Sequence, residues 1–584
     1  MSTTADEPTR APSAEGARGL PDGTGAHARV VLDGAGLDVG GVVRLADHDA
    51  VPDVPAEPLA RVRHAWQAAE RLAARGRLYG RGTGVGAHRQ IAVDEADLAG
   101  HGLRLLRSHA GGAGAVLPAR QARAMLAVRA NQLLAGGSGI HPDFVEALAE
   151  ALRLGVHPAI TEYGSVGTGD LTALAQTGLA LLGEHPWLGA PSDASGPGAG
   201  HPRAGSPRGV GPYEDGSPIP VPRRPRSGTA ASRPQAAPQP QAIAQPQSGT
   251  TAPRPQPAPR PRAAPAAGAG LPAPVMLRPG DALALLSSSA LTLGQAALAC
   301  HDLTVLLRAA HAVAALSLLA VSGSTEAYAA PVHAVRPYPG PARAAAEVRR
   351  LLGLPDRPPP GGGRRVQDPY GFRAFPQVHG AALDAAERLR HVVETEINCP
   401  TENPLIVPDE DTAYHHGGFY AAPLGLALDA ADLALLGTAQ LSAARLAGLG
   451  RADLTGLPAF LAEGPAGSSG TMIMEYTAHS ALAELRASAS PASAGHAVLS
   501  HGLEEAAGFA SQAARQALRA VDAYRTVLAC ELVVAVRALR LSGTTPDMPA
   551  FTVASAVLPP QTEDRPLTPD ISEATDLLPH LAHL

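Results

Sequence analysis

Residue types that could do chemistry gather in one glycine-dense stretch, Gly164-Ser-Val-Gly-Thr-Gly-Asp-Leu171, which runs into an alanine- and leucine-rich segment. Gly167 and Gly169 flank a hydroxyl side chain, and glycine lets the backbone adopt angles that other residues avoid. Three interpretations stay open: a turn in which Asp170 caps the following helix, a phosphate cradle, and a reactive backbone site. A P-loop needs the pattern G-x-x-x-x-G-K-[ST]. The stretch has no lysine, so the phosphate interpretation is weak and no nucleotide is expected.

A second glycine-rich stretch, Tyr79-Gly-Arg-Gly-Thr-Gly-Val-Gly86, starts with a tyrosine. Its alternating glycines exclude regular structure and predict a loop. No apolar strand precedes it, so it is not a dinucleotide-binding fingerprint. Tyr79 is therefore either a surface side chain or a proton-transfer group carried by a lid. His109 ends a predicted helix before another glycine cluster, and by itself it fits a structural histidine as well as a catalytic one.

Composition excludes several classes of function. The net charge of -6, the lack of a basic run and the aromatic content of 3% argue against a nucleic-acid partner. The three cysteines, Cys300, Cys399 and Cys530, lie too far apart for a disulfide framework or a cysteine-based zinc site, and free thiols fit the cytoplasm. His379 and the adjacent pair His415-His416 have no carboxylate or cysteine at ligand spacing, so we expect no metal site.

The elements that must position these residues are helices. Hydrophobic residues make up 45% of the 584-residue chain although aromatic residues are rare, so alanine and leucine must fill the core. Long helical tracts without strand patterns between them predict an all-α bundle of long helices. These tracts are Ala282–Val321, Ala342–Leu352, Phe375–Glu396, Leu424–Leu449, Ala478–Ala487 and Leu503–Leu541. The most apolar run, Val305 to Val321, contains Arg308 and His311, which indicates a buried helix and no membrane partner.

Four parts are predicted along the chain. Residues 1–28 form a disordered N-terminal tail without the apolar core of a signal peptide. Residues 29–188 form an N-terminal part with the tyrosine loop and the glycine turn. Residues 189–274, rich in Pro, Ala and Gln, predict a disordered insertion that cannot bury enough apolar surface to fold. Residues 275–584 form the central and C-terminal long-helix bundle.

Several segments, taken in order, resemble the aromatic amino acid lyase family, which includes the histidine and phenylalanine ammonia-lyases. They are Tyr79-Gly-Arg-Gly-Thr-Gly-Val-Gly86, Ser108-His-Ala110, Gly155-Val-His-Pro158, Gln367-Asp-Pro-Tyr-Gly-Phe-Arg373 and Thr401-Glu-Asn-Pro-Leu405. The family's Gly-Asn-Phe-His-Gly segment appears here in altered form, as Gly417-Gly-Phe-Tyr-Ala421. The resemblance covers almost the whole chain. It implies an all-α homotetramer with active sites shared among three subunits. The implied reaction removes ammonia from an aromatic or imidazole amino acid and leaves an α,β-unsaturated acid.

The resemblance also implies a methylidene-imidazolone group, which the family makes from an internal Ala-Ser-Gly. The family pattern Gly-Ser-Val-Gly-Ala-Ser-Gly-Asp-Leu is one residue shorter in this chain, so the cyclising tripeptide would be Gly167-Thr168-Gly169. Dehydration of Thr168 would give an ethylidene that is more hindered than the family's alkene. Ser287 stands where the family has the asparagine that polarises the ring carbonyl, and a hydroxyl is a shorter, weaker donor.

Further roles follow from the resemblance. Tyr79 would be the base that removes the β-proton, its phenol acidified by nearby positive charge. Arg373 would grip the substrate carboxylate, because a guanidinium binds a carboxylate through two hydrogen bonds. Tyr370 would assist at the amino group or the prosthetic group. The remaining expected substrate contacts are His109, Glu484, Gln367 and Phe419. For His109 and Glu484 a structural histidine and a solvated glutamate remain open alternatives.

Two hypotheses of function result. The first is an ammonia-lyase-like enzyme that acts on an aromatic or imidazole amino acid, favoured by the retained Tyr79, Tyr370 and Arg373. The second is a diverged member without the prosthetic group, which acts as a binding or scaffold protein or does different chemistry. The shortened turn and Ser287 favour this second hypothesis.

Overall fold

Long apolar helices dominate the structure, which confirms the predicted all-α class. The computed structural model describes residues 28–76, 78–189, 270–361 and 363–584, and these belong to one unit. The predicted N-terminal tail and insertion lie almost entirely outside the described residues.

The helices are α1 (Val39–Asp47), α2 (Ala56–Arg75), α3 (Leu98–His109), α4 (Ala119–Leu134), α5 (Asp143–Arg153), α6 (Leu171–Leu181), α7 (Asp281–Leu286), α8 (Ala290–Ala320), α9 (Ala330–Ala334), α10 (Pro339–Leu351), α11 (Tyr370–Arg373), α12 (Phe375–Glu396), α13 (Ala422–Leu449), α14 (Ala452–Thr455), α15 (Met472–Ser488), α16 (Ala510–Leu541), α17 (Pro549–Val557) and α18 (Thr568–Leu581).

Short strands supplement the helices at the edges of the bundle. They are β1 (Ala28–Val31), β2 (Ala50–Asp53), β3 (Ala113–Val116), β4 (His157–Pro158), β5 (Thr161–Tyr163), β6 (Trp187–Leu188), β7 (Leu405–Val407) and β8 (Thr412–Tyr414). In the described chain they pair as β1 with β2 in parallel, and as β3 with β5, β4 with β6 and β7 with β8 in antiparallel order. Segments this short cannot display the alternation that identifies a strand in a sequence.

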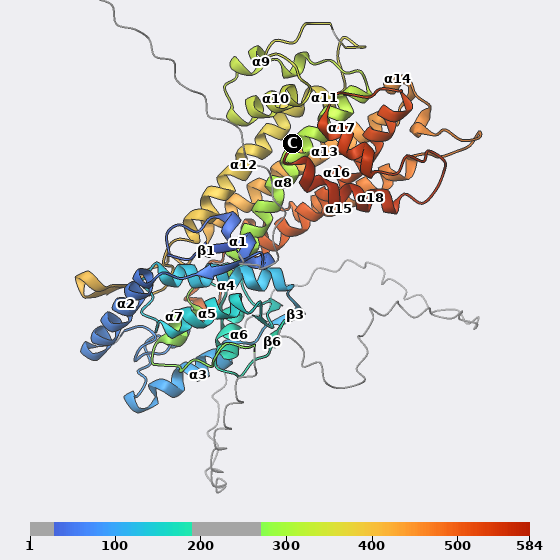
Figure 1. Ribbon diagram of the computed structural model, residues 1–584. Coiled ribbons are helices and arrows are strands. Elements are labelled where there is room, and N and C mark those ends of the chain that lie inside the picture. Colours follow the sequence, from blue (N-terminus) through green and yellow to red (C-terminus); the bar gives the residue numbers. More distant parts are fainter. Residues whose placement is uncertain (1–27, 77, 190–269, 362) are drawn as a thin grey trace, which may run out of the picture. The chain divides into compact units, whose positions relative to one another are not determined.

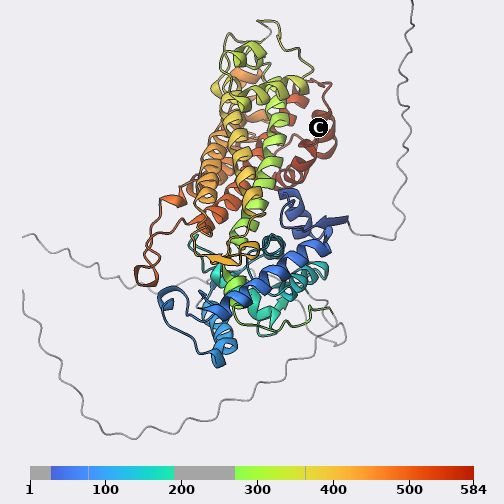
Figure 2. The same cartoon turned by 90° about the vertical axis from the view of Figure 1, so that its left-hand side faces the viewer.

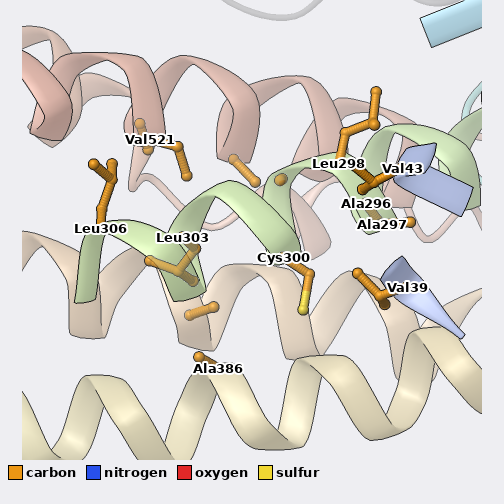
Figure 3. Packing of buried hydrophobic residues seen from close by; sticks show 14 of the residues in the cluster. Val39, Val43, Ala296, Ala297, Leu298, Cys300, Leu303, Leu306, Ala386 and Val521 are labelled. Atoms are coloured by element: carbon orange, nitrogen blue, oxygen red, sulfur yellow. The ribbon is translucent and has the colours of Figure 1, made fainter. Parts of the chain in front are cut away.

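The core lies where α8, α12 and α16 run side by side. Figure 3 shows Leu303 and Leu306 of α8 beside Ala386 of α12 and Val521 of α16. Alanine at such contacts lets the helices approach closely, as the low aromatic content predicted. By length and composition α13 and the tract Asp281–Ala320 could cross a membrane, but 56% and 78% of their apolar windows are buried inside the protein. Burial of this kind is typical of core helices.

A buried ion pair ties three of the long helices together. Glu531 of α16 accepts hydrogen bonds from Arg445 of α13 (Nε to Oε1, 2.6 Å) and from Ser317 of α8 (Oγ to Oε1, 2.7 Å). Both charged side chains are almost completely buried. A charge is costly to bury unless it is paired and hydrogen-bonded, so these contacts fix how the three helices pack against one another.

The prediction of one continuous helix over Ala282–Val321 is wrong. The helix breaks at Ser287–Ser289 into α7 and α8. The hydroxyl of Ser288 donates to Gln132 Oε1 over 2.6 Å, and its carbonyl accepts the N–H of Asp170 over 2.7 Å. Serine side chains offer the backbone such alternatives to a helical ladder. The predicted start of the last long helix at Leu503 is also wrong, because α16 begins at Ala510.

The long helices separate two ends of the unit. Figure 1 places α3, α6 and α7 at one end and α10, α11 and α14 at the other, and the colours in Figure 2 show the same separation. Helix α8 has 31 residues, which correspond to a length of about 46 Å at 1.5 Å per residue. This length decides which of the predicted site residues can meet within one chain.

Candidate functional site

A cavity of about 660 Å³ lies where several helices begin, and the glycine turn forms part of its wall. It brings together residues from distant parts of the chain that the sequence analysis selected. These residues are Tyr79, His109, Thr168, Gly169, Ser287 and Phe419. Gly167 is buried directly behind Thr168. A pocket of this size suits a ligand as large as an amino acid.

The turn has the backbone that a cyclising glycine needs. Gly167 and Gly169 have φ angles of +88° and +107°, which side chains rarely tolerate. The N–H of Ala421 makes only a long contact of 3.5 Å with the carbonyl of Gly167. The N–H of Gly169 has no acceptor among the described residues. The nitrogen that would attack is therefore unengaged.

Three helices begin at this turn. The carbonyl of Val166 accepts the N–H of Phe509, the residue before α16, over 2.8 Å. Ala421, which bonds to Gly167, precedes α13, and Asp170 precedes α6. The N-terminus of a helix carries a partial positive charge because its first N–H groups are unpaired. The arrangement therefore stabilises negative charge that develops beside Thr168.

The expectation that Asp170 caps its own helix is wrong. Its carboxylate instead accepts two hydrogen bonds from Thr292 in the first turn of α8, from N–H over 2.8 Å and from Oγ1 over 2.9 Å. The side chain is 1% exposed, and burial raises the pKa of the carboxyl group against the opposing effect of these bonds. Asp170 thus joins the glycine turn to the start of the central helix.

Tyr79 lies in the cavity wall, where its hydroxyl oxygen accepts the N–H of Gly86 over 2.9 Å. Burial raises the pKa of the phenol above its ordinary value, and the nearby negative charge of Glu504 acts in the same direction. The hydrogen bond from Gly86 opposes the shift, and the positive charge of Arg89 opposes it more weakly. The expected acidification of Tyr79 by positive charge is therefore wrong for the described chain, because desolvation outweighs the single cation nearby.

His109 presents one ring nitrogen to the cavity. Its Nδ1 lies 2.9 Å from the carbonyl of Leu105, which can only accept, so Nδ1 carries the proton in that contact. Nε2 is then the nitrogen free to meet a ligand. Ser287 lines the same wall, and its carbonyl accepts a hydrogen bond from Thr401 Oγ1 over 3.1 Å.

Four predicted site residues lie outside this cavity: Tyr370, Arg373, Gln367 and Glu484. Tyr370 is 68% exposed, with the guanidinium of Arg373 4.4 Å from its ring centroid. This segment is attached to the far end of α8, where Arg365 Nη2 donates to the carbonyl of Val321 over 2.8 Å. The length of α8 therefore keeps Arg373 away from Thr168 within one chain. Nε of Arg373 is buried and has no partner among the described residues.

Sequence reasoning missed several residues that line the cavity. These are His88, His101, Arg104, Asn403, Ser500 and Glu504. His101 and Arg104 lie on α3, and the other four lie in short 3-10 turns or loops, where no recognisable spacing marks them. Asn403 lies in the segment Thr401–Leu405, which carried part of the resemblance. That resemblance was the one signal in the sequence that could have identified a missed cavity residue.

The histidines considered for metal binding have other contacts. His379 is buried, with Nδ1 2.9 Å from Thr438 Oγ1 and Nε2 3.1 Å from the carbonyl of Leu307. His416 Nε2 lies 2.7 Å from the carbonyl of Glu402. The described residues contain no group of three or more His, Cys, Asp or Glu side chains arranged to hold a metal ion.

Gly167→Ala should destabilise the protein more than Gly169→Ala. A Cβ at Gly167 would lie 2.7 Å from the backbone nitrogens of Phe509 and Ala510, whereas a Cβ at Gly169 would meet no atom closer than 3.7 Å. Both substitutions strain a positive φ, so the difference isolates the clash. We expect G167A to cost about 1–3 kcal/mol more than G169A in urea unfolding. Equal losses would contradict the packing described for Gly167.

Comparisons with known proteins show the family and the fold of the chain. The model of the aromatic amino acid lyase family matches residues 37–196 and 257–557. A histidine ammonia-lyase of Anaeromyxobacter sp. (strain K) is 34% identical over 516 residues, which cover 86% of this chain and 88% of the relative. The crystal structure of histidine ammonia-lyase from Trypanosoma cruzi has a TM-score of 0.74 and 25% identity, covering 94% of this chain and 93% of its own. That of tyrosine aminomutase from Streptomyces globisporus has a TM-score of 0.76 and 26% identity, with 95% and 97% covered. The chain therefore belongs to the aromatic amino acid lyase family.

Proposed function

We propose that the chain is an ammonia-lyase-like enzyme that eliminates ammonia from an aromatic or imidazole L-amino acid. The products are ammonia and the α,β-unsaturated acid, so the substrate loses its amino group and one β-proton. The observation that carries the proposal is the cavity in which Thr168 and Gly169 face Tyr79 and His109 at converging helix N-termini. The similarity to histidine ammonia-lyases favours an imidazole side chain as the substrate group.

A methylidene-imidazolone-like group would be held by Gly167-Thr168-Gly169. The unengaged amide of Gly169 and the positive φ angles of both glycines support its formation. It requires a bond from the Gly169 nitrogen to the Gly167 carbonyl carbon and the loss of two water molecules, one of them from the Thr168 hydroxyl. When formed, the group supplies an electrophilic alkene. Ser287 and the start of α13 are the donors in position to stabilise negative charge on it.

The chain's own side chains supply the remaining chemistry. Tyr79 as phenolate would take the β-proton, since it is the phenol in the cavity wall. Nε2 of His109 would hydrogen-bond the side chain of the substrate. Arg373, whose guanidinium lies over the ring of the exposed Tyr370, would bind the substrate carboxylate.

We further propose a homotetramer in which the sites are shared between chains. The support is the position of Tyr370, Arg373 and Gln367 at or near a surface at the far end of α8 from Thr168, and the exposure of Glu484 outside the cavity wall. A neighbouring copy could bring its Arg373 to the cavity of the first chain, and closed symmetry makes each such contact repeat. A location in the cytoplasm stays a prediction of the sequence.

The alternative is a diverged member that binds a ligand in the cavity without forming the group. Two observations favour it: the turn is one residue shorter than the family pattern, and Ser287 replaces an asparagine. The two functions differ in the covalent state of Thr168, so the mass of that peptide separates them.

Mass spectrometry of the peptide that spans Thr168 should show a deficit of about 36 Da, which corresponds to two lost waters. Thr168→Ala should prevent the full 36 Da deficit and abolish ammonia release from histidine, tyrosine and phenylalanine, because one of the two waters comes from the Thr168 hydroxyl and without it no alkene forms. Thr168→Ser is the matched control and should keep both. An unmodified wild-type peptide would support the alternative function.

Co-expression of Tyr79→Phe and Arg373→Gln chains should restore activity that neither variant has alone. If Tyr79 and Arg373 of one site come from different chains, about a quarter of the sites in mixed assemblies regain both residues. Ammonia release from purified mixed oligomers, compared with each variant alone, measures the effect. Mixtures as inactive as the separate variants would place both residues of a site in one chain.

The rising limb of the pH profile of kcat/KM should follow the loss of the Tyr79 proton, because only the phenolate is a base, and both burial and Glu504 raise the pKa of this phenol. Glu504→Gln should shift this limb to lower pH, since it removes the negative charge that raises the pKa. Glu505→Gln is the control, because Glu505 is exposed and lies outside the cavity wall. A profile that Glu504→Gln leaves in place would argue against Tyr79 as the base.

A further inference from the structure

A second cavity of about 900 Å³ lies on the side of the bundle, between α8, α10, α12 and the end of α18. No residue in its wall belongs to the first cavity. Each of the three longer helices contributes one face, with side chains three and four positions apart, such as Leu307, Arg308 and His311 on α8. The cavity is thus a product of the regular packing of these helices and not of a loop.

The wall has an excess of positive charge. Four arginines and two glutamates line it, together with Leu584, whose carbonyl oxygen accepts a hydrogen bond from Arg350 Nη2 over 2.9 Å. Arg343 pairs with Glu387 over 2.8 Å, and Arg350 pairs with Glu347. Arg308 and Arg390 have no carboxylate within ion-pair distance among the described residues, and Arg390 Nη2 only donates a 3.3 Å hydrogen bond to a threonine hydroxyl. Two guanidinium groups are therefore available to an anion, and each could bind a carboxylate.

A buried acceptor completes the wall. His311 is 5% exposed, and its Nδ1 lies 3.2 Å from the carbonyl of Arg308. Its Nε2 is buried and has no partner among the described residues. Burial lowers the pKa of His311 to about 4, so the ring is neutral near pH 7 and Nε2 is a bare acceptor. An unsatisfied buried acceptor is costly, and a donor on a ligand would remove that cost.

We propose that this cavity binds a small organic acid with an apolar body. Its carboxylate contacts Arg308 and Arg390, its body packs against Leu307, Leu351 and Leu383, and an O–H or N–H group donates to Nε2 of His311. The volume lies in the range of cavities that hold metabolite-sized ligands. The site is separate from the proposed catalytic cavity, so its occupation does not depend on the prosthetic group.

Three related compounds test the proposed features by titration calorimetry on the full chain. 4-Hydroxyphenylacetate has the acid, the ring and the donor; phenylacetate lacks the donor; 4-hydroxyphenylacetamide lacks the charge. Because an aromatic acid could also enter the catalytic cavity, all titrations use the Arg373→Gln chain. We expect one molecule of 4-hydroxyphenylacetate bound per chain, with at least tenfold weaker binding of each of the other two compounds.

Substitutions locate that binding. Arg308→Gln and Arg390→Gln should each weaken the binding of 4-hydroxyphenylacetate at least tenfold. Arg388→Gln is the matched control, because Arg388 lies on α12 beside the cavity residues but is exposed and does not line the wall. Absence of binding, equal binding of the three compounds, or equal effects of all three substitutions would each overturn the proposal. Ammonia release and the mass of the Thr168 peptide are not part of this test, so its failure leaves the proposed function untouched.

Discussion

The hydrogen bonds between the glycine turn and the first residues of the long helices are the contacts on which the rest of the structure depends. Backbone N–H groups at the starts of α13 and α16 donate to the carbonyls of Gly167 and Val166. The carboxylate of Asp170 accepts from the first turn of α8. These contacts satisfy groups that a helix end leaves unpaired, so bundle and turn fix each other's position. The cavity exists because helix starts, and not helix sides, meet at this place.

The electrostatics of the cavity follow from the same geometry. Partial positive charges at the helix starts are fixed by the backbone and need no reorganisation when negative charge develops nearby. The side chains add little charge close to Tyr79: Glu504 is negative and Arg89 acts only weakly. A single chain therefore has a site that favours anions through its backbone while it keeps its phenol protonated. A cation brought by another chain would lower the pKa of the Tyr79 phenol. It would leave the preference of the helix starts for anions unchanged.

The fold was largely predictable from the sequence, and the site only in part. Long tracts rich in alanine and leucine identified helices such as Phe375–Glu396 to the residue, because the pattern repeats over many turns. The break at Ser287–Ser289 was not predictable, since it depends on Gln132 and Asp170, which are remote in sequence. Glu504 was missed for the same reason. The packing of neighbouring segments decides whether a loop side chain lines a cavity, and the spacing of residues within the loop does not indicate it.

The chemistry of Tyr79 shows where a motif stops being informative. Its place beside the glycine turn could be inferred from the resemblance, and the cavity contains it. The pKa of its phenol could not be inferred from the sequence, because desolvation depends on every group packed around the ring.

The close packing around Gly167 also limits which sequences this turn accepts. In this turn the Cβ of an alanine at that position would collide with the backbone nitrogens of Phe509 and Ala510. A side chain there therefore requires the start of α16 to move. Thr168 lines the cavity instead, so a change of its side chain alters the surface that a ligand meets and leaves the start of α16 in place.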